Sequence, residues 1–354
     1  MVAYFIIYAI NLLTSFIYRV SRKWYAWING LAIWILMSFR SYSVGSDTIN
    51  YINLYSQIDT ISIPHNILNW FYPTNGARFE NGYLLLNKFL YSISKNPRFL
   101  LIITSAIFVI CLVYLCTQLD LNMVIGFICF ESLGFMSFFL SGIRQALACS
   151  FCMVAFVFVV KKRPIIFLIF VYLAMSMHVS AIIFILTYMF NFLKNNAKSY
   201  LLVTSCSAVF IFYFDKLFTA FSSKSEELSN FSLSTENSGG YLNVILSVLI
   251  IISVMVMTKH LMLSKSIMSV RYSNYMLLIA IVFYLISLAS TQIARVAMYF
   301  EIGLFVDISY IYIYYRRKNV IMCNLIILLM IASFVVIQVF RPERTGIVPY
   351  VWLN

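Results

Sequence analysis

The sequence predicts an all-α polytopic membrane protein with about 12 transmembrane helices and one large extracytoplasmic loop. Hydrophobic residues make up 62% of the 354 positions and charged residues only 10%, whereas a soluble domain has about 25% charged residues. The mean hydropathy is +0.91. The apolar runs also recur at lengths of roughly 17–25 residues, which span a bilayer as helices.

The candidate spans follow one another along the whole chain, which we treat as one transmembrane domain, residues 1–354. They cover residues 3–18, 24–39, 99–117, 122–140, 143–160, 164–177, 178–193, 200–221, 241–258, 272–290, 294–315 and 320–340. The run from Met1 to Ile17 has no positive n-region and no small-residue cleavage site, so we interpret it as a span rather than a signal peptide. The short runs 164–177 and 178–193 are also compatible with one bent or re-entrant segment.

Basic residues gather in alternate loops, which sets the expected orientation. More than half of the Lys and Arg residues lie in loops whose single acid is Asp120, and the positive-inside rule places these loops in the cytoplasm. They are Arg19, Arg22, Lys23, Lys161, Lys162, Arg163, Lys194, Lys198, Lys259, Lys265, Arg271, Arg316, Arg317 and Lys318. The other loops, and with twelve spans both termini, then face outward.

Residues 40–98 form the large outer loop, and residues 222–240 form a second, flexible and solvated one. In the first, Ser46 or Asp47 is suited to capping the helix that follows, whose weak apolar face is typical of an interfacial helix. The aromatic residues Trp70 and Tyr72 are either membrane-belt residues or faces for stacking a sugar. The size of this loop suggests a substrate with a bulky polar part on the outer side.

Arg144 lies where one apolar run ends and the next begins. A charged Arg at the mouth of a membrane helix is a functional-site hypothesis, because it is costly in hydrocarbon. Arg144, Ala148 and Cys152 are four residues apart and share one narrow helix face. Either a neighbouring helix packs there below a snorkelling Arg, or a lipid chain lies there with its anionic head against Arg144.

His178 lies at the outer end of two short spans, at the start of an inward-running helix. The positive end of a helix dipole disfavours the imidazolium form, which makes His178 a candidate general base. The simpler alternative is a packing or interface residue. Arg295 repeats the arrangement of Arg144, and anions bind well where helix N-termini and Arg meet. We therefore expect a phosphate or diphosphate site at the outer boundary of the membrane, formed by Arg144, His178 and Arg295.

Three of the acids inside predicted spans should face the bundle interior with partners. They are Glu131, Glu301 and Asp307, and Arg144 is one candidate partner for the last two. The seven Cys lie in apolar runs and no Cys/His cluster is present, so we expect neither disulfides nor a metal site. The net charge of +13 is spread over the loops rather than gathered in a patch, which does not favour nucleic-acid binding.

Four motifs together resemble the EpsG-type polysaccharide polymerases, relatives of the Wzy O-antigen polymerases. The resemblance spans roughly residues 1–310 and rests on Arg40 with Val44-Gly45-Ser46-Asp47-Thr48 and Tyr51, on Glu80-Asn81-Gly82-Tyr83, on Ile143-Arg144-Gln145-Ala146-Leu147-Ala148, and on His178-Val179-Ser180-Ala181. Arg295 with Tyr299-Phe300 matches a later region less firmly. Leu147 departs from the β-branched residue that is common there.

The resemblance implies polymerisation of undecaprenyl-diphosphate-linked oligosaccharide repeat units into an O-antigen, capsule or exopolysaccharide, on the outer face of the bacterial cytoplasmic membrane. Donor and acceptor are both lipid-linked, a chain-length regulator is a further partner, and neither a cofactor nor a metal is needed, because Arg can do the work of a divalent ion. A single displacement would invert the anomeric centre.

Site roles follow from that chemistry. Departure of a diphosphate needs stabilisation of its charge, and the acceptor hydroxyl needs a base. The expected diphosphate ligands are Arg144, Gln145, Arg295, Arg40 and Arg341. The expected bases are His178 first, then Asp47 and Glu80. The expected sugar contacts are Trp70, Tyr72 and Tyr51.

Three other activities share some of these features. An O-antigen-type ligase would use the same donor chemistry. A lipid-linked oligosaccharide flippase should carry charges along a central path, whereas the candidate residues here cluster at one face. A membrane O-acyltransferase could use His178, but the Arg pattern suits a diphosphate better.

Overall fold

The chain is helical throughout the part that the structure describes. The computed structural model describes residues 1–61, 79–194, 196–222, 240–259, 261, 268–288, 293–336 and 346–353. Within these ranges there is no β-strand, only one isolated antiparallel bridge between Arg40 and Trp352. The prediction of an all-α class is confirmed.

The helices follow the predicted spans closely. They are α1 (Val2–Leu13), α2 (Ser15–Val20), α3 (Arg22–Ser38), α4 (Thr48–Gln57), the 3₁₀ helix η1 (Ile58–Thr60), α5 (Asn81–Ile93), α6 (Arg98–Gln118), α7 (Met123–Ser132), α8 (Phe135–Ser141), α9 (Ile143–Val160), α10 (Pro164–Met177), the 3₁₀ helix η3 (Val179–Phe192), α11 (Ala197–Ser222), α13 (Gly240–Thr258), α14 (Met268–Ile286), α15 (Ala294–Lys318) and α16 (Val320–Val335). Each of the predicted spans overlaps one or two of these helices.

Fewer helices than predicted are long and apolar enough to cross a bilayer unaided. Among the described residues there are 5, and up to 6 if a bent pair is one span. The 5 are Val2–Val20, Arg98–Gln118, Ile143–Val160, Met268–Ile286 and Ala294–Lys318. The structure therefore supports a membrane protein but does not confirm the number twelve.

The predicted span 122–140 is broken rather than straight. Helices α7 and α8 meet at an angle of 64°. Between them Gly134 has a φ of +87°, a conformation that glycine adopts without steric cost. The break lets α8 turn away from the direction of α7 and deliver the chain to the start of α9.

The chain divides into two compact units, and both boundaries fall within helices. The first unit contains Met1–Ile185 and Tyr312–Asn354, and the second contains Leu186–Ile311. In the first, α9 packs against α6 and α10, and α6 packs against α3. Its core includes the rings of Phe108, Phe130 and Phe139, with Phe108 4.4 Å from each of the other two.

The second unit is built around α14. This helix packs against α11 and α13. It also faces α15, where the rings of Phe283 and Phe300 stack with centroids 5.7 Å apart. The polar side chains of α14 are buried together with its apolar ones, which a helix surrounded by protein can accommodate.

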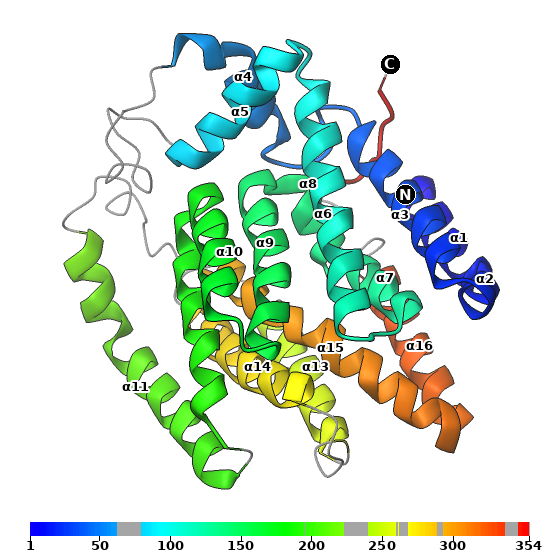
Figure 1. Ribbon diagram of the computed structural model, residues 1–354, viewed down its shortest axis with the longest axis vertical. Coiled ribbons are helices and arrows are strands. Elements are labelled where there is room, and N and C mark those ends of the chain that lie inside the picture. The colour runs from blue at the N-terminus through cyan, green and yellow to red at the C-terminus, as the bar shows by residue number, and fades with distance from the viewer. Residues whose placement is uncertain are drawn as a thin grey trace. The chain divides into compact units, whose positions relative to one another are not determined.

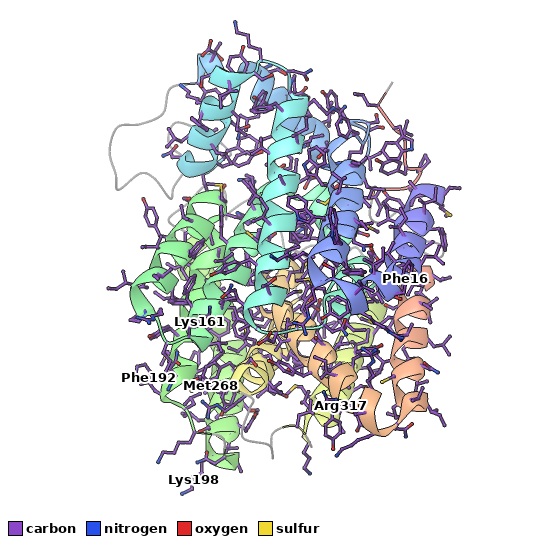
Figure 2. All side chains as sticks on the ribbon, turned by 45° about the vertical axis from the view of Figure 1, so that its right-hand side comes forward. Phe16, Lys161, Phe192, Lys198, Met268 and Arg317 are labelled. Carbon is purple, nitrogen blue, oxygen red and sulfur yellow. The ribbon has the colours of Figure 1, made fainter. Side chains whose placement is uncertain are left out.

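Large apolar side chains remain exposed on the outer faces of the helices. Phe16, labelled in Figure 2, is 65% exposed, and Trp27 and Ile165 are exposed by 73% and 74%. A soluble protein rarely leaves so many of these uncovered, whereas a bilayer covers them. The exposure therefore agrees with a protein embedded in lipid.

Two segments of the large predicted loop are helical. Figure 1 shows α4 and α5 lying across one end of α6 and α10, and α5 packs directly on α10. The C-terminal segment 346–353 runs beside residues 39–45. The backbone N–H groups of Ser41 and Gly45 donate to Val351 O at 2.8 Å and to Gly346 O at 2.7 Å. Tyr4, near the start of the chain, donates to Ile347 O at 2.7 Å, so both chain ends lie beside the start of this loop.

Candidate functional site

Three of the predicted site residues come together at one carboxylate. Glu80 Oε2 accepts a hydrogen bond from Arg144 Nη1 at 2.5 Å. Glu80 Oε1 lies 2.7 Å from His178 Nδ1 and accepts from the backbone N–H of Val179 at 3.1 Å. The three side chains come from the loop before α5, the first turn of α9 and the end of α10, so the fold joins motifs that are 98 positions apart at most.

The Glu80 carboxylate is buried and ionised. Its side chain is 6% exposed, whereas those of Arg144 and His178 are 19% and 26% exposed. Burial raises the pKa of Glu80, but the hydrogen bond from His178 and the charge of Arg144 outweigh it and lower the pKa to about 2. The two basic side chains therefore form the solvent-facing side of the cluster.

Gly82 allows Glu80 to reach His178. A Cβ at position 82 would lie 2.5 Å from Ser176 Cβ and 2.6 Å from Ser176 O, far closer than packed atoms approach. Only glycine lets the first turn of α5 press against the last turn of α10. Because His178 follows that turn directly, the contact at Gly82 brings it to Glu80.

Aromatic side chains orient Arg144. Its guanidinium carbon lies 4.8 Å from the centroid of the Phe79 ring, a cation–π geometry. Arg144 donates a side-chain hydrogen bond to Tyr51, whose ring packs 6.3 Å from Phe79 and 5.9 Å from Tyr83. Tyr51 is 5% exposed, so its position favours holding Arg144 over stacking a sugar.

The loop with Arg40 and Thr48 supports the start of α9 from behind. Arg40 Nη2 and Thr48 Oγ1 each donate to Leu140 O at 3.1 Å, at the end of α8. Gly45, with a φ of +94°, lies so close that a Cβ would be 2.2 Å from the same carbonyl oxygen. These contacts fix the short connection through Gly142 that leads to Arg144.

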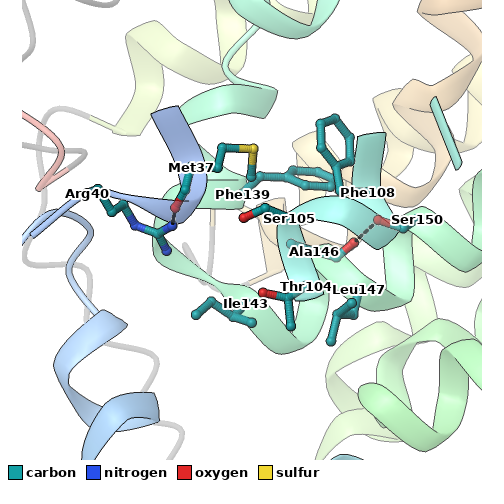
Figure 3. A pocket seen from close by; sticks show the side chains of 10 residues that line it. All are labelled: Met37, Arg40, Thr104, Ser105, Phe108, Phe139, Ile143, Ala146, Leu147 and Ser150. Carbon is teal, nitrogen blue, oxygen red and sulfur yellow. Dashed lines mark hydrogen bonds between the residues drawn. The ribbon is translucent and has the colours of Figure 1, made fainter. Parts of the chain in front are cut away.

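Arg40 faces protein rather than a ligand. Its side chain is 1% exposed and also donates to the carbonyls of Met37 and, at 3.3 Å, Val44. Figure 3 shows it beside a cavity between α3, α6, α8 and α9. The cavity has room for about one water molecule and cannot take a diphosphate.

The comparison with known proteins gives the family of the chain. A model of the EpsG family matches residues 23–352. The chain belongs to the EpsG family. EpsG is a family of Wzy-like polysaccharide polymerases, related to glycosyltransferases. No curated protein and no solved structure was found to match the chain.

The remaining predicted site residues of this EpsG chain are distributed over several parts of the chain. Gln145 is buried beside Arg144 in the first turn of α9, and Asp47 is the residue before α4, where it makes no side-chain cap. Arg295 belongs to the second unit, in the first turn of α15. The predictions for Trp70, Tyr72 and Arg341 lie outside the described residues.

Two functional groups of the EpsG site were missed by sequence reasoning. Phe79 supports the guanidinium of Arg144, and the backbone N–H of Val179 binds Glu80. Phe79 directly precedes one motif and Val179 lies within another, and this proximity is the only signal that could have indicated them. The partnership of Glu80 with both basic residues was also missed, because Glu80 was considered as a base.

Three of the acids inside the predicted spans have uncharged partners in the described part of the chain. Asn11 donates to Glu131 at 3.1 Å, and Tyr284 donates to Glu301 at 2.7 Å. Ser273 and Asn274 donate to Asp307. The sequence analysis predicted that these acids lie in the interior and that each has a partner. Arg144 was a candidate partner for Glu301 and Asp307, but the acid that pairs with it is Glu80.

The geometry of the EpsG site suits proton transfer next to an anion. If Nδ1–H of His178 donates to Glu80, Nε2 carries the lone pair and can accept a proton. Arg144 supplies a fixed positive charge on the same side of the carboxylate. Among the described residues, no group of three or more His, Cys, Asp or Glu could hold a metal ion.

Proposed function

We propose that this EpsG-family chain polymerises undecaprenyl-diphosphate-linked oligosaccharide repeat units into a surface polysaccharide by inverting glycosyl transfer. The observation that carries the proposal is the cluster of Glu80, Arg144 and His178, in which a base and a cation share one buried carboxylate. The family supports a polysaccharide polymerase in general. The lipid-linked substrate and the leaving group are part of the proposal.

His178 is the general base of the proposed reaction. Its Nε2 removes the proton from a hydroxyl of the acceptor as the oxygen attacks the anomeric carbon of the donor. The bond between that carbon and the diphosphate oxygen breaks, and undecaprenyl diphosphate leaves with the electron pair. Glu80 holds the imidazole in the required tautomer and stabilises the imidazolium that forms, as a carboxylate behind a catalytic His does elsewhere.

Arg144 stabilises the leaving group. Charge develops on the diphosphate as the glycosidic bond breaks, and a positioned guanidinium lowers the energy of that state. Its place in the first turn of α9 adds the positive end of the helix dipole. Gln145, Arg295 and Arg341 stay proposed contacts for the diphosphate, and Trp70 and Tyr72 for the sugar. Arg40 is assigned to the scaffold instead, because its guanidinium binds backbone carbonyls.

The site is proposed to face outward from the bacterial cytoplasmic membrane. The loop that carries Glu80 lies in the set of connections in which most of the acidic residues accompany the basic ones, and the orientation expected from the positive-inside rule places this set outside. The partners are then a lipid-linked donor and acceptor within reach of that surface, with a chain-length regulator as a further candidate.

Glycan length in a deletion strain tests the proposal. Wild type should restore long chains, whereas Arg144→Ala and His178→Ala should leave single repeat units on the normal acceptor while the protein still accumulates in the membrane. Wild-type chain lengths from Arg144→Ala would remove the proposed site. Lipid-linked units that build up on the inner side would identify a flippase, and long chains retained on undecaprenyl diphosphate a ligase.

A further inference from the structure

The two oxygens of the Glu80 carboxylate are bound unequally. Oε1 has two anchors, the imidazole of His178 at 2.7 Å and the backbone N–H of Val179 at 3.1 Å. Oε2 faces Arg144 at 2.5 Å. If Arg144 moved to another anion, Glu80 would still be held by both anchors.

We infer that Glu80 is an internal counter-anion, which competes with the substrate diphosphate for Arg144 and is displaced from it when the lipid-linked diphosphate binds. The inference rests on the proposed function, since it deepens the role of the same site. It names the class of ligand that exchanges with Oε2, an organic diphosphate.

The exposure of Arg144 and the aromatic ring that supports its guanidinium favour this exchange. Arg144 is 19% exposed and Glu80 is 6% exposed, so a ligand from solvent meets the guanidinium before the carboxylate. The Phe79 ring, 4.8 Å from the guanidinium carbon, supports the cation without neutralising it. The guanidinium can therefore turn over the Phe79 ring toward another anion while Glu80 stays on its two anchors.

The exchange has two chemical consequences. In the resting site one positive and one negative charge cancel, which limits the affinity for the diphosphate and so promotes release of the leaving group. Once the diphosphate occupies Arg144, the full charge of Glu80 acts on His178. This stabilises the imidazolium that forms when His178 takes the acceptor proton, so donor binding prepares the base.

Binding of inorganic pyrophosphate to the purified full-length chain in lipid nanodiscs tests the inference. Glu80→Gln keeps the shape and an oxygen acceptor but removes the competing charge, so pyrophosphate should bind at least about tenfold more tightly while polymerisation is lost. Asp59→Asn is the matched control, because it removes an exposed negative charge from the same predicted loop. Its pyrophosphate affinity should equal that of wild type.

The outcomes separate this inference from the proposed function. Equal or weaker pyrophosphate binding by Glu80→Gln overturns the counter-anion role, even if Arg144→Gln abolishes polymerisation. Arg144→Gln that keeps both pyrophosphate binding and polymerisation overturns the proposed function itself. Should Glu80→Gln fail to accumulate, Glu80→Asp retains the charge but withdraws it from Arg144, and it should bind pyrophosphate more tightly than wild type by a smaller factor.

A lipid probe distinguishes the source of the diphosphate. Farnesyl diphosphate carries the same head on a short polyprenyl chain, and it should bind at least as tightly as pyrophosphate and show the same gain in Glu80→Gln. Binding of pyrophosphate without binding of farnesyl diphosphate would overturn the assignment to a lipid-linked ligand.

Discussion

At the scale of single residues, the site depends on one carboxylate whose charge is held in a buried position. Glu80 satisfies both basic partners at once, and each partner keeps a more exposed side for a ligand. The balance of charge within the cluster depends on the ionised carboxylate of Glu80. An acid that is ionised next to Arg and His contributes stability only while it keeps its charge.

The stability provided by Glu80 should depend on pH in a defined window. Its pKa is lowered from 4.5 to about 2 in the folded chain, so protonation favours unfolding. The contribution is fully present above about pH 4.5 and is lost as the pH falls through about 2. Thermal unfolding in detergent should show wild type more stable than Glu80→Gln near neutral pH and the difference shrinking between about pH 4.5 and pH 2. A difference that is constant over this range would contradict the assignment.

Arg144→Lys should lose polymerisation by about a hundredfold or more. An ammonium is a point charge, so it cannot lie flat over the Phe79 ring and also present a planar fork to a diphosphate. The measurement is glycan length together with the initial rate in membranes. Lys318→Arg, an exposed basic change far along the sequence, is the control and should keep the wild-type rate.

At the scale of helices, the site is assembled by close contacts at glycines. Gly82 lets α5 pack closely against α10, and Gly45 lets the loop between α3 and α4 pack against the end of α8. These contacts explain why the two motifs contain glycines, which have no side chain to take part in a reaction. They locate Glu80 and Arg144 by excluding any side chain at the point of contact.

Gly82→Ala should destabilise the protein by about 1–3 kcal/mol and lower activity more than stability explains. The added Cβ would overlap Ser176, so α5 must move and carry Glu80 away from His178. Gly142→Ala is the matched control, because the nearest atom to its Cβ would be at an ordinary 3.5 Å. The measurements are the melting temperature and the polymerisation rate of both variants. Equal behaviour of the two would show that Gly82 does not set the contact.

At the scale of the whole chain, the structure ties the C-terminal segment to the site through the loop that follows α3. The segment 346–353 binds the backbone of residues 39–45, and this loop in turn binds Leu140 ahead of Arg144. The family match extends to residue 352 and so includes this segment. The segment is therefore part of the scaffold of the site.

Ending the chain after residue 345 should loosen that loop. The amide groups of Ser41 and Gly45 lose their acceptors at Val351 and Gly346, so their hydrogen exchange should become faster by about tenfold or more. Exchange in the middle of α9 should stay at the wild-type rate and serves as the internal control. Unchanged exchange at both amides would exclude a supporting role for the segment.

Much of this architecture could be predicted from the pattern of apolar runs. The runs predict nearly all helices, because a bilayer demands long hydrophobic segments. The break at Gly134 was not predicted, since nothing in an apolar run indicates which glycine bends it. The number of helices that cross the membrane also depends on how each one lies, which composition does not state.

The site was predicted in part, for reasons that individual residues make clear. Arg144 and His178 stand out because charged and titratable groups are costly near hydrocarbon. Their meeting at Glu80 depends on contacts between helices far apart in sequence, such as Gly82 on Ser176. Arg40 was predicted as a diphosphate ligand because it is a basic residue of a motif that resembles the family, whereas its burial among carbonyls could be known only from the fold.

The order of synthesis gives the shared carboxylate another meaning. Glu80 leaves the ribosome before Arg144 and His178, so the loop that carries it lacks Arg144 until the chain has grown to residue 144 and has both basic partners only from residue 178. Until then the acid keeps its hydration, because burying it alone would cost several kcal/mol. Docking of α5 must therefore wait for α9 and α10 to be in place. The cluster of Glu80, Arg144 and His178 therefore forms only after these helices are in place, so the proposed catalytic groups come together late in synthesis.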